Sequence, residues 1–273
     1  MTVNAQVKLA ARYGAPEIEP LKQWNDTLYQ LLDHRSVRAF TDQPLPDGTI
    51  ETLIAAAQSA STSSNLQVWS VVAVRERDRK NRLSALAGNQ AYIRQAPLFF
   101  VWLADLSRVV RIGEQSDTEL EALPYLESLL LGTIDAALAA QNAVVALESL
   151  GLGSVYIGAI RNDIEGVAKE LELPPQVYPV FGLCVGYPST ERPAKVKPRL
   201  PQDAVLHHET YSAAGEGSVL AEYDERLGAF YQREGMKASG WSEQVVNRLR
   251  SVSSLHGREV LVEELKRMGF GLR

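Results

Sequence analysis

Apolar residues recur along the chain in two spacings, which predict helices alternating with short buried strands. Intervals of three to four residues predict helices over 21–33, 46–60, 78–87, 120–150 and 161–171. Short runs of β-branched, aromatic and other apolar residues predict strands over 69–74, 97–104, 154–160 and 178–186. The opening residues are mixed in character and predict no regular element. Three amphipathic helices are predicted near the C-terminus, over 219–233, 241–253 and 258–268.

The longest apolar stretch, 129–147, is about as long as a membrane-spanning helix. Asp135 interrupts it, and a charged residue near the centre of an isolated spanning helix costs roughly 2.5–3.5 kcal/mol. Apolar residues surround nearly the whole circumference, which favours a helix packed on several sides in a core or a subunit interface. We therefore expect no membrane partner, and we expect Asp135 to bond across an interface.

Composition narrows the class of protein. The 273 residues include 28 basic and 33 acidic side chains, for a formal charge of −5, and without a basic arm no nucleic-acid partner is expected. The single cysteine, Cys184, excludes an internal disulfide and lies in an apolar run typical of a buried strand. With no recognisable secretory signal, the sequence predicts a cytoplasmic protein. We divide the chain into an N-terminal extension (1–24), a main domain (25–205) and a helical C-terminal excursion of that domain (206–273).

Several common catalytic motifs are absent from the sequence. It contains no Walker loop, HExxH, CxxC or GxSxG, and no set of ligands at metal-binding spacing. The glycine-rich stretch 151–158 lies between a predicted helix and a predicted strand, whereas a dinucleotide-binding loop needs a strand, a turn and then a helix. A Rossmann-type site is therefore not expected.

Two basic clusters carry the clearest chemical signal. The sequence HRSVR (34–38) places three possible cations and a hydroxyl within five residues, and KPRLP (197–201) places two cations around a proline that stiffens the backbone. In extended conformations, alternate side chains point to one side, so each cluster presents several donors together. Charge-assisted bonds of this kind suit a phosphate dianion. The alternative is that both clusters are ordinary surface charge.

A series of motifs resembles one family in the same order. These are HRSVRAFTDQPL, the loop STSSNLQ, AGNQAYI, the block IDAALAAQNAVVALESLGLGSVYIGAIRN, PVFGLCVGYP and KPRLP. From about residue 25 to the C-terminus, the chain resembles the flavin-dependent nitroreductase superfamily, most closely its oxygen-insensitive NADPH nitroreductase and flavin reductase branch. The resemblance implies an α+β fold with a mostly antiparallel sheet surrounded by helices, in an intertwined homodimer with a helical C-terminal excursion. It also implies one tightly bound FMN at each end of the subunit interface.

The resemblance assigns the cofactor-binding residues by motif. The two basic clusters would hold the phosphate, the ribityl chain and part of the ring through His34, Arg35, Ser36, Val37, Arg38, Lys197, Pro198 and Arg199. The second subunit would supply Thr62, Ser63, Ser64, Asn65 and Gln67. The polar edge of the ring would meet Gln90, and the backbone of Tyr156, Ile157, Gly158 and Ala159 would run past the ring. Arg38 would lie at the pyrimidine edge, where a fixed cation stabilises the negative charge that reduction places there.

Two positions depart from the family pattern, and three others bear on the substrate. Asn65 and Ala159 replace residues more usual in relatives, which affects the ring's tilt and potential, and a methyl at 159 is unfavourable only in a left-handed turn. Arg258 would border the open flavin face, the alternative being an ion pair with a neighbouring glutamate on its helix. Arg233 and Lys237 fall near a loop that in relatives meets the extra phosphate of NADPH, so NADPH is favoured over NADH.

The predicted function is an FMN-dependent NAD(P)H oxidoreductase. The dinucleotide would reduce FMN and leave, and a small-molecule acceptor would then enter the same face in a ping-pong cycle that needs no catalytic side chain beyond the flavin. Nitroaromatics, quinones, azo compounds and free flavin are the expected acceptors. Two alternatives remain open: a flavin storage or sensor module with little turnover, and a flavin-dependent fragmentation or dehalogenation.

Overall fold

The chain forms two compact units, which are described separately below. In the computed structural model, residues 2–15, 17–19 and 21–273 are described, so Met1, Pro16 and Pro20 of the predicted N-terminal extension lie outside the described residues. The first unit joins the N-terminal segment up to Arg35 to Lys195–Ser254. The second unit comprises Ser36–Ala194 and Leu255–Arg273.

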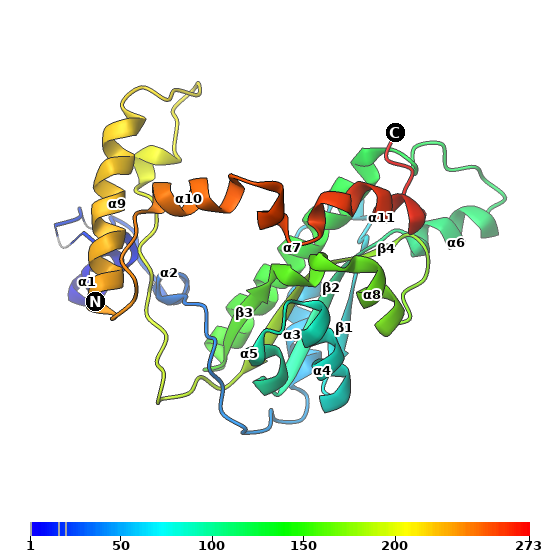
Figure 1. Cartoon of the computed structure of the whole chain (residues 1–273), viewed down its shortest axis with the longest axis horizontal. Coiled ribbons are helices and arrows are strands. Elements are labelled where there is room, and N and C mark those ends of the chain that lie inside the picture. Colours follow the sequence, from blue (N-terminus) through cyan, green and yellow to red (C-terminus); the bar gives the residue numbers. More distant parts are fainter. Residues whose placement is uncertain (1, 16, 20) are drawn as a thin grey trace. The chain divides into compact units, whose positions relative to one another are not determined.

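The second unit is built on a four-stranded antiparallel sheet (Figure 1). Its order is β1 (Trp69–Val74), β2 (Leu98–Asp105), β4 (Val177–Gly186) and β3 (Gly153–Ile157). Every residue of β2 is buried, which confirms the central strand predicted from its continuous apolar run. The sheet confirms the predicted antiparallel α+β fold.

Helices cover both faces of this sheet. Successive side chains of β2 point to opposite faces, and because all of them are apolar or buried, both faces need a covering layer. Phe99 and Val101 belong to a core that also includes residues of α4 (Arg77–Leu86), α5 (Ala91–Gln95) and α8 (Ile164–Glu170). Phe100 and Trp102 belong to a second core, shared with α3 (Thr49–Gln58) and α7 (Leu126–Ser149). The predicted arrangement of a sheet surrounded by helices is thus confirmed.

Helix α7 carries the apolar stretch that the sequence analysis singled out. Among the described residues it is the one helix long and apolar enough to cross a membrane by length and composition. It packs on α3 and β2, and Asp135, near its middle, is 1% exposed. The helix begins six residues later than predicted, because 121–125 form a turn and a bend around Pro124. Helix α6 (Ser107–Gln115) and α5 were not predicted.

The segment after β3 differs from the sequence prediction. The strand predicted over 154–160 ends at Ile157, and a 3₁₀-helix follows over Gly158–Asn162. The predicted helix 258–268 likewise starts as a 3₁₀-turn, Arg258–Val260, and becomes α11 (Leu261–Arg267). The first correction concerns backbone that is predicted to run past the flavin ring, and the second concerns the segment that carries Arg258, a predicted substrate-binding residue.

The first unit consists of α1 (Thr2–Tyr13), α2 (Asp26–Asp33), α9 (Glu216–Arg233) and α10 (Trp241–Leu249). Residues of α9, including Tyr223, Leu227, Phe230 and Tyr231, form its apolar core. Helix α2 begins five residues later than predicted, where the Asn25 side chain accepts a hydrogen bond from the Leu28 amide and caps the helix. The prediction that the chain opens without regular structure is wrong, because α1 buries Leu9 and Arg12 against the rest of this unit.

Candidate functional site

The predicted phosphate-binding segment Lys197–Arg199 is fixed along its backbone in the first unit. The Lys197 carbonyl accepts a hydrogen bond from the Arg12 guanidinium at 3.2 Å, and the Arg199 amide donates to the Arg12 carbonyl at 2.8 Å. Between them, the Pro198 carbonyl accepts from the Tyr223 hydroxyl at 2.9 Å. The segment therefore holds its side chains in a defined direction.

The same arginine reaches the other basic cluster. The Arg12 guanidinium also donates to the carbonyls of Leu32 and His34, at 3.0 and 2.5 Å. Arg12 itself is only 7% exposed. One buried side chain thus joins the backbone of Leu32 and His34 to the segment Lys197–Arg199, which the sequence places about 160 residues away. The structure brings these predicted phosphate ligands together within the first unit.

Two of the predicted phosphate ligands beside this junction, Arg35 and Lys197, already have partners. The Arg35 guanidinium forms an ion pair with Asp33 at 2.7 Å, and Lys8 of α1 pairs with the other oxygen of the same carboxylate. The Lys197 ammonium donates to the Tyr231 hydroxyl at 3.0 Å. The cationic side chains of Arg35 and Lys197 are therefore fixed by Asp33 and Tyr231 and are not free to move on the surface.

Arg233 and Lys237, the predicted dinucleotide contacts, also lie in the first unit. Arg233 ends α9 and lines a cavity of about 560 Å³ together with Lys8, Asp33 and Lys195. Lys237 follows four residues later in an exposed loop. The cavity has both positive and negative lining charges.

In the second unit, the remainder of the HRSVR motif runs beside β3. The Val37 amide donates to the Ser154 carbonyl at 2.8 Å, and Val37 is 3% exposed. The neighbouring Arg38 is exposed and lies within hydrogen-bonding reach of Tyr92. Burial raises the pKa of Tyr92, and the nearby Arg38 charge opposes that rise. The motif therefore buries its valine and presents Arg38 to solvent.

The loop Thr62–Gln67, called the serine loop below, is held in place by the Asp135 side chain of helix α7. One oxygen of Asp135 accepts from the Thr62 hydroxyl at 2.5 Å and the Val68 amide at 3.2 Å, and the other accepts from the Ser63 amide at 3.2 Å. The expectation that Asp135 bonds across an interface is wrong for these contacts, because all three lie within the chain.

The loop that Asp135 anchors has an unusual backbone. Ser64, Asn65 and Gln67 have φ values of 48°, 55° and 50°, in the left-handed region that side chains disfavour. Asparagine tolerates this region better than most residues do, so the backbone conformation at position 65 explains why asparagine stands where relatives usually have another residue. Of the loop residues predicted to contact the second subunit's FMN, Thr62 is partly buried and the others are exposed. Strained, exposed backbone held by a buried carboxylate is typical of a binding loop.

The 3₁₀-helix Gly158–Asn162 presents open backbone at Gly158. A β-carbon built there would meet only the end of the Arg161 side chain, at 3.5 Å, so no packing within the chain requires glycine. Close approach of a ligand to the backbone is a reason for it. Ala159 is 9% exposed and lies outside the left-handed region, so its methyl group is accommodated.

Arg258 lies beside this turn. Its Nε donates to the Asn162 side-chain oxygen at 2.9 Å. The preceding Gly257 has φ 94°, and a β-carbon there would lie 2.6 Å from the Asn162 carbonyl oxygen, so the close approach requires glycine. Gln90, also in this unit, caps α5, and its carbonyl accepts from the Ser84 hydroxyl at 3.0 Å.

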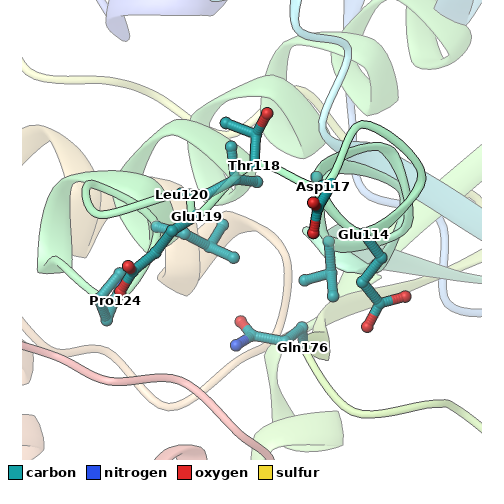
Figure 2. A pocket seen from close by; sticks show the side chains of 10 residues that line it. Glu114, Asp117, Thr118, Glu119, Leu120, Pro124 and Gln176 are labelled. Atoms are coloured by element: carbon teal, nitrogen blue, oxygen red, sulfur yellow. The ribbon is translucent and has the colours of Figure 1, made fainter.

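Each unit holds groups that suit one part of FMN. In the first unit, the cations of the two basic segments suit a phosphate dianion, and in the second unit the open backbone at Gly158 suits a flat ring. A second cavity, of about 610 Å³, does not fit a dianion, because Glu114, Asp117 and Glu119 line it (Figure 2). None of the predicted site residues lines that cavity.

Sequence reasoning missed the residues that hold this site in place, namely Arg12, Asn162 and the intrachain role of Asp135. The only sequence signal among them is the lone carboxylate of Asp135 in an apolar helix. Arg12 lies in a segment that no motif marks.

Comparisons with known proteins identify the family. The chain matches the nitroreductase family over residues 31–187 and the nitroreductase family C-terminal domain over residues 197–273. It is 40% identical to the FMN reductase (NADPH) of Bacillus subtilis over 251 residues, which cover 90% of this chain and 98% of that protein.

Two further relatives agree. The oxygen-insensitive NADPH nitroreductase of Salmonella typhimurium is 41% identical over 249 residues, covering 90% of this chain and 99% of that protein. The solved structure of NfrA2 from B. megaterium superimposes with a TM-score of 0.85 at 38% identity, covering 92% of this chain and 100% of that one. The resemblance stated from the motifs is thus confirmed, and the chain belongs to the nitroreductase family.

Proposed function

We propose that this chain binds FMN through the two basic segments that Arg12 joins, and that it passes electrons from NAD(P)H to small-molecule acceptors. Relatives of about 40% identity are an FMN reductase and an NADPH nitroreductase, and the chain is accordingly an FMN-dependent NAD(P)H oxidoreductase. The observation that carries the binding proposal is the convergence of His34 and Lys197–Arg199 on one buried guanidinium.

The phosphate is held by side chains of both segments. Lys197 and Arg199 project from backbone that is hydrogen-bonded at each residue, so little conformational entropy is lost when they take up a dianion. His34, Arg35 and Ser36 complete the donor set, with Arg35 oriented by Asp33. Val37 and Pro198 give each segment its shape.

The ring would lie against backbone and polar side chains. The segment Tyr156–Ala159, whose backbone is open at Gly158, would offer an N–H to the ring, and Gln90 would meet its polar edge. FMN held there would supply the hydride-accepting, two-electron chemistry that links the dinucleotide to the acceptor. Arg38, exposed and charged, stabilises negative charge at the pyrimidine edge. No side chain of the protein acts as nucleophile or general acid.

Three cations serve the substrates. Arg258, oriented by Asn162 beside the Gly158–Asn162 turn, borders the face at which dinucleotide and acceptor arrive in turn. Arg233 and Lys237 meet the extra phosphate of NADPH, which is the preferred donor. Because one face serves both substrates, the kinetics are ping-pong, and nitroaromatics, quinones, azo compounds and free flavin are the acceptor classes.

The protein acts as a cytoplasmic homodimer. Leu126, Leu130, Ile134 and Leu138 are 48%, 45%, 54% and 43% exposed and recur every four residues on α7. Such an apolar stripe on one helix suits a second copy of the chain. The exposed serine loop Thr62–Gln67 would then reach the second subunit's FMN. We expect Ile134→Asp to shift sedimentation from dimer to monomer and to release FMN.

The deciding experiment is an anaerobic titration of the purified protein. We expect flavin absorbance near stoichiometry that bleaches faster with NADPH than with NADH and returns when a nitroaromatic is added. Arg38→Ala should lower FMN retention, whereas Arg258→Ala should keep FMN and raise the KM for dinucleotide or acceptor. A flavin that bleaches but is not reoxidised would instead support storage or sensing. A colourless protein that takes up no FMN would refute the proposal.

A further inference from the structure

Helix α1 lies outside the part of the chain that the family model covers. The family match begins at residue 31, and the alignment with the Bacillus FMN reductase covers 90% of this chain. Yet α1 docks through buried residues, with Leu9 2% and Arg12 7% exposed. A helix that precedes the matched region and yet packs through buried residues is a candidate for a role in positioning the residues it contacts.

The contacts of Arg12 fall on backbone that carries the predicted phosphate ligands. Its planar guanidinium donates to the carbonyls of Leu32, His34 and Lys197, and its own carbonyl accepts from the Arg199 amide. The rigid fork of arginine suits several acceptors at once, which a single ammonium does not. Both segments are therefore tied to one point on α1.

A second residue of α1 adjusts the local charge. Asp33 immediately precedes the HRSVR motif, and its carboxylate would repel a phosphate dianion placed beside His34 and Arg35. Lys8 forms an ion pair with that carboxylate while Arg35 binds its other oxygen. The pairing offsets the negative charge at this point, so α1 favours anion binding electrostatically as well as sterically.

We propose that α1 is a clamp for the FMN phosphate, with Arg12 as its positioning residue. Arg12 touches neither the cofactor nor the substrate in this account, and acts by holding the two basic segments at the separation at which their side chains converge. The inference rests on the proposed FMN-binding role of those segments. It follows that Arg12 matters to the binding of FMN more than to the binding of riboflavin, which has the same ring but no phosphate.

The test compares the two flavins on full-length protein from which flavin has been removed. Dissociation constants for FMN and riboflavin are measured by fluorescence titration for the native protein, Arg12→Ala and Arg12→Lys. The matched control is Arg226→Ala, which removes an arginine of the same unit that pairs with Glu222 on the surface of α9. Circular dichroism melting reports whether each variant folds.

We expect Arg12→Ala to weaken FMN binding roughly 10- to 100-fold, as when groups that orient metal ligands are removed, and to leave riboflavin binding nearly unchanged. Arg12→Lys should fall between the native protein and Arg12→Ala, and Arg226→Ala should match the native protein. If Arg12→Ala does not fold, Arg12→Lys decides by the same comparison.

Two results would overturn the clamp. A native preference for FMN in the Arg12 variants would show that the segments need no positioning, and an equal loss of both flavins would show a purely structural role. The variant Lys197→Ala distinguishes failure of the clamp from failure of the proposed phosphate site. If it abolishes the preference for FMN while the Arg12 variants keep it, only the clamp is wrong, whereas a native preference in Lys197→Ala refutes the phosphate site and the clamp together.

Discussion

Replacing Asp135 by asparagine exchanges one carboxylate oxygen for an NH₂ group and tests how the serine loop is held. The carboxylate is 1% exposed and accepts bonds from the Thr62 hydroxyl and from the amides of Ser63 and Val68. An asparagine can keep its carbonyl oxygen toward Thr62 and Val68, but its NH₂ group then faces the Ser63 amide, and two donors meet. In the other orientation the NH₂ group faces the Val68 amide, and the Thr62 hydroxyl has to accept a hydrogen bond instead of donating one.

The expected cost follows from these contacts. A hydrogen bond to a charged group contributes about 1.5–3 kcal/mol, and a buried donor left unpaired costs about 1–3 kcal/mol. Because asparagine keeps two of the three contacts in its better orientation, we expect a loss of about 2–4 kcal/mol in the free energy of unfolding. For a protein of this size, about 2–4 °C in Tm per kcal/mol gives a drop of roughly 4–16 °C.

Thermal unfolding of flavin-free protein and FMN titration together provide the assay. Asp105→Asn is the matched control, because that carboxylate is 7% exposed and accepts from the Ser70 hydroxyl and from the amide and hydroxyl of Ser107, outside the loop. Both variants should lose stability, but only Asp135→Asn should weaken FMN binding. Native stability in Asp135→Asn, or equal FMN loss in both variants, would refute the reasoning.

Three further predictions concern single positions. Gly257→Ala should raise the KM for dinucleotide in steady-state assays with little loss of FMN, because its methyl would meet the Asn162 carbonyl at 2.6 Å and displace Arg258; an unchanged KM would contradict this. Cys184 is fully buried and burial raises the pKa of its thiol, so a thiol reagent should label it only after denaturation, and rapid labelling of native protein would disprove the burial. Burial, with nearby acidic groups, raises the pKa of Glu264. Its ionised form therefore costs stability at neutral pH, and Glu264→Gln should stabilise the protein by about 1 kcal/mol there and by nothing below about pH 4 in urea unfolding at each pH.

The sequence predicted the sheet well because its strands are marked by composition. The prediction for β1 has the observed bounds, and β2 and β4 differ by a single residue at one or both ends. All three are runs dominated by apolar or β-branched residues, and β2 and β4 are buried along almost their whole length. The strand over 154–160 was overextended because Ile157 to Ile160 stay apolar while the backbone turns at Gly158, and burial does not distinguish a strand from a 3₁₀-turn.

Helix α1 was missed for a different reason. Its sequence, TVNAQVKLAARY, has few large apolar residues, and its stability depends on docking rather than on a strong amphipathic pattern. The buried face includes Arg12, and arginine in a sequence ordinarily indicates a solvent-exposed position. Only the tertiary structure shows that the carbonyls of Leu32, His34 and Lys197 satisfy that guanidinium.

The residues that motifs identify and the residues that hold them belong to different classes. His34, Lys197 and Arg258 are polar residues in recognisable sequence contexts, and each is proposed to act through a side chain that would meet a ligand. The residues that orient such groups are buried polar side chains whose partners are mostly backbone carbonyls and amides, as with Arg12 and Asp135. Backbone groups are the same in every residue type, so the sequence of the partner contains no trace of the contact. Positioning residues must therefore be found from burial and hydrogen bonding, and a conservative substitution that keeps size but changes donors reports on them more sharply than alanine does.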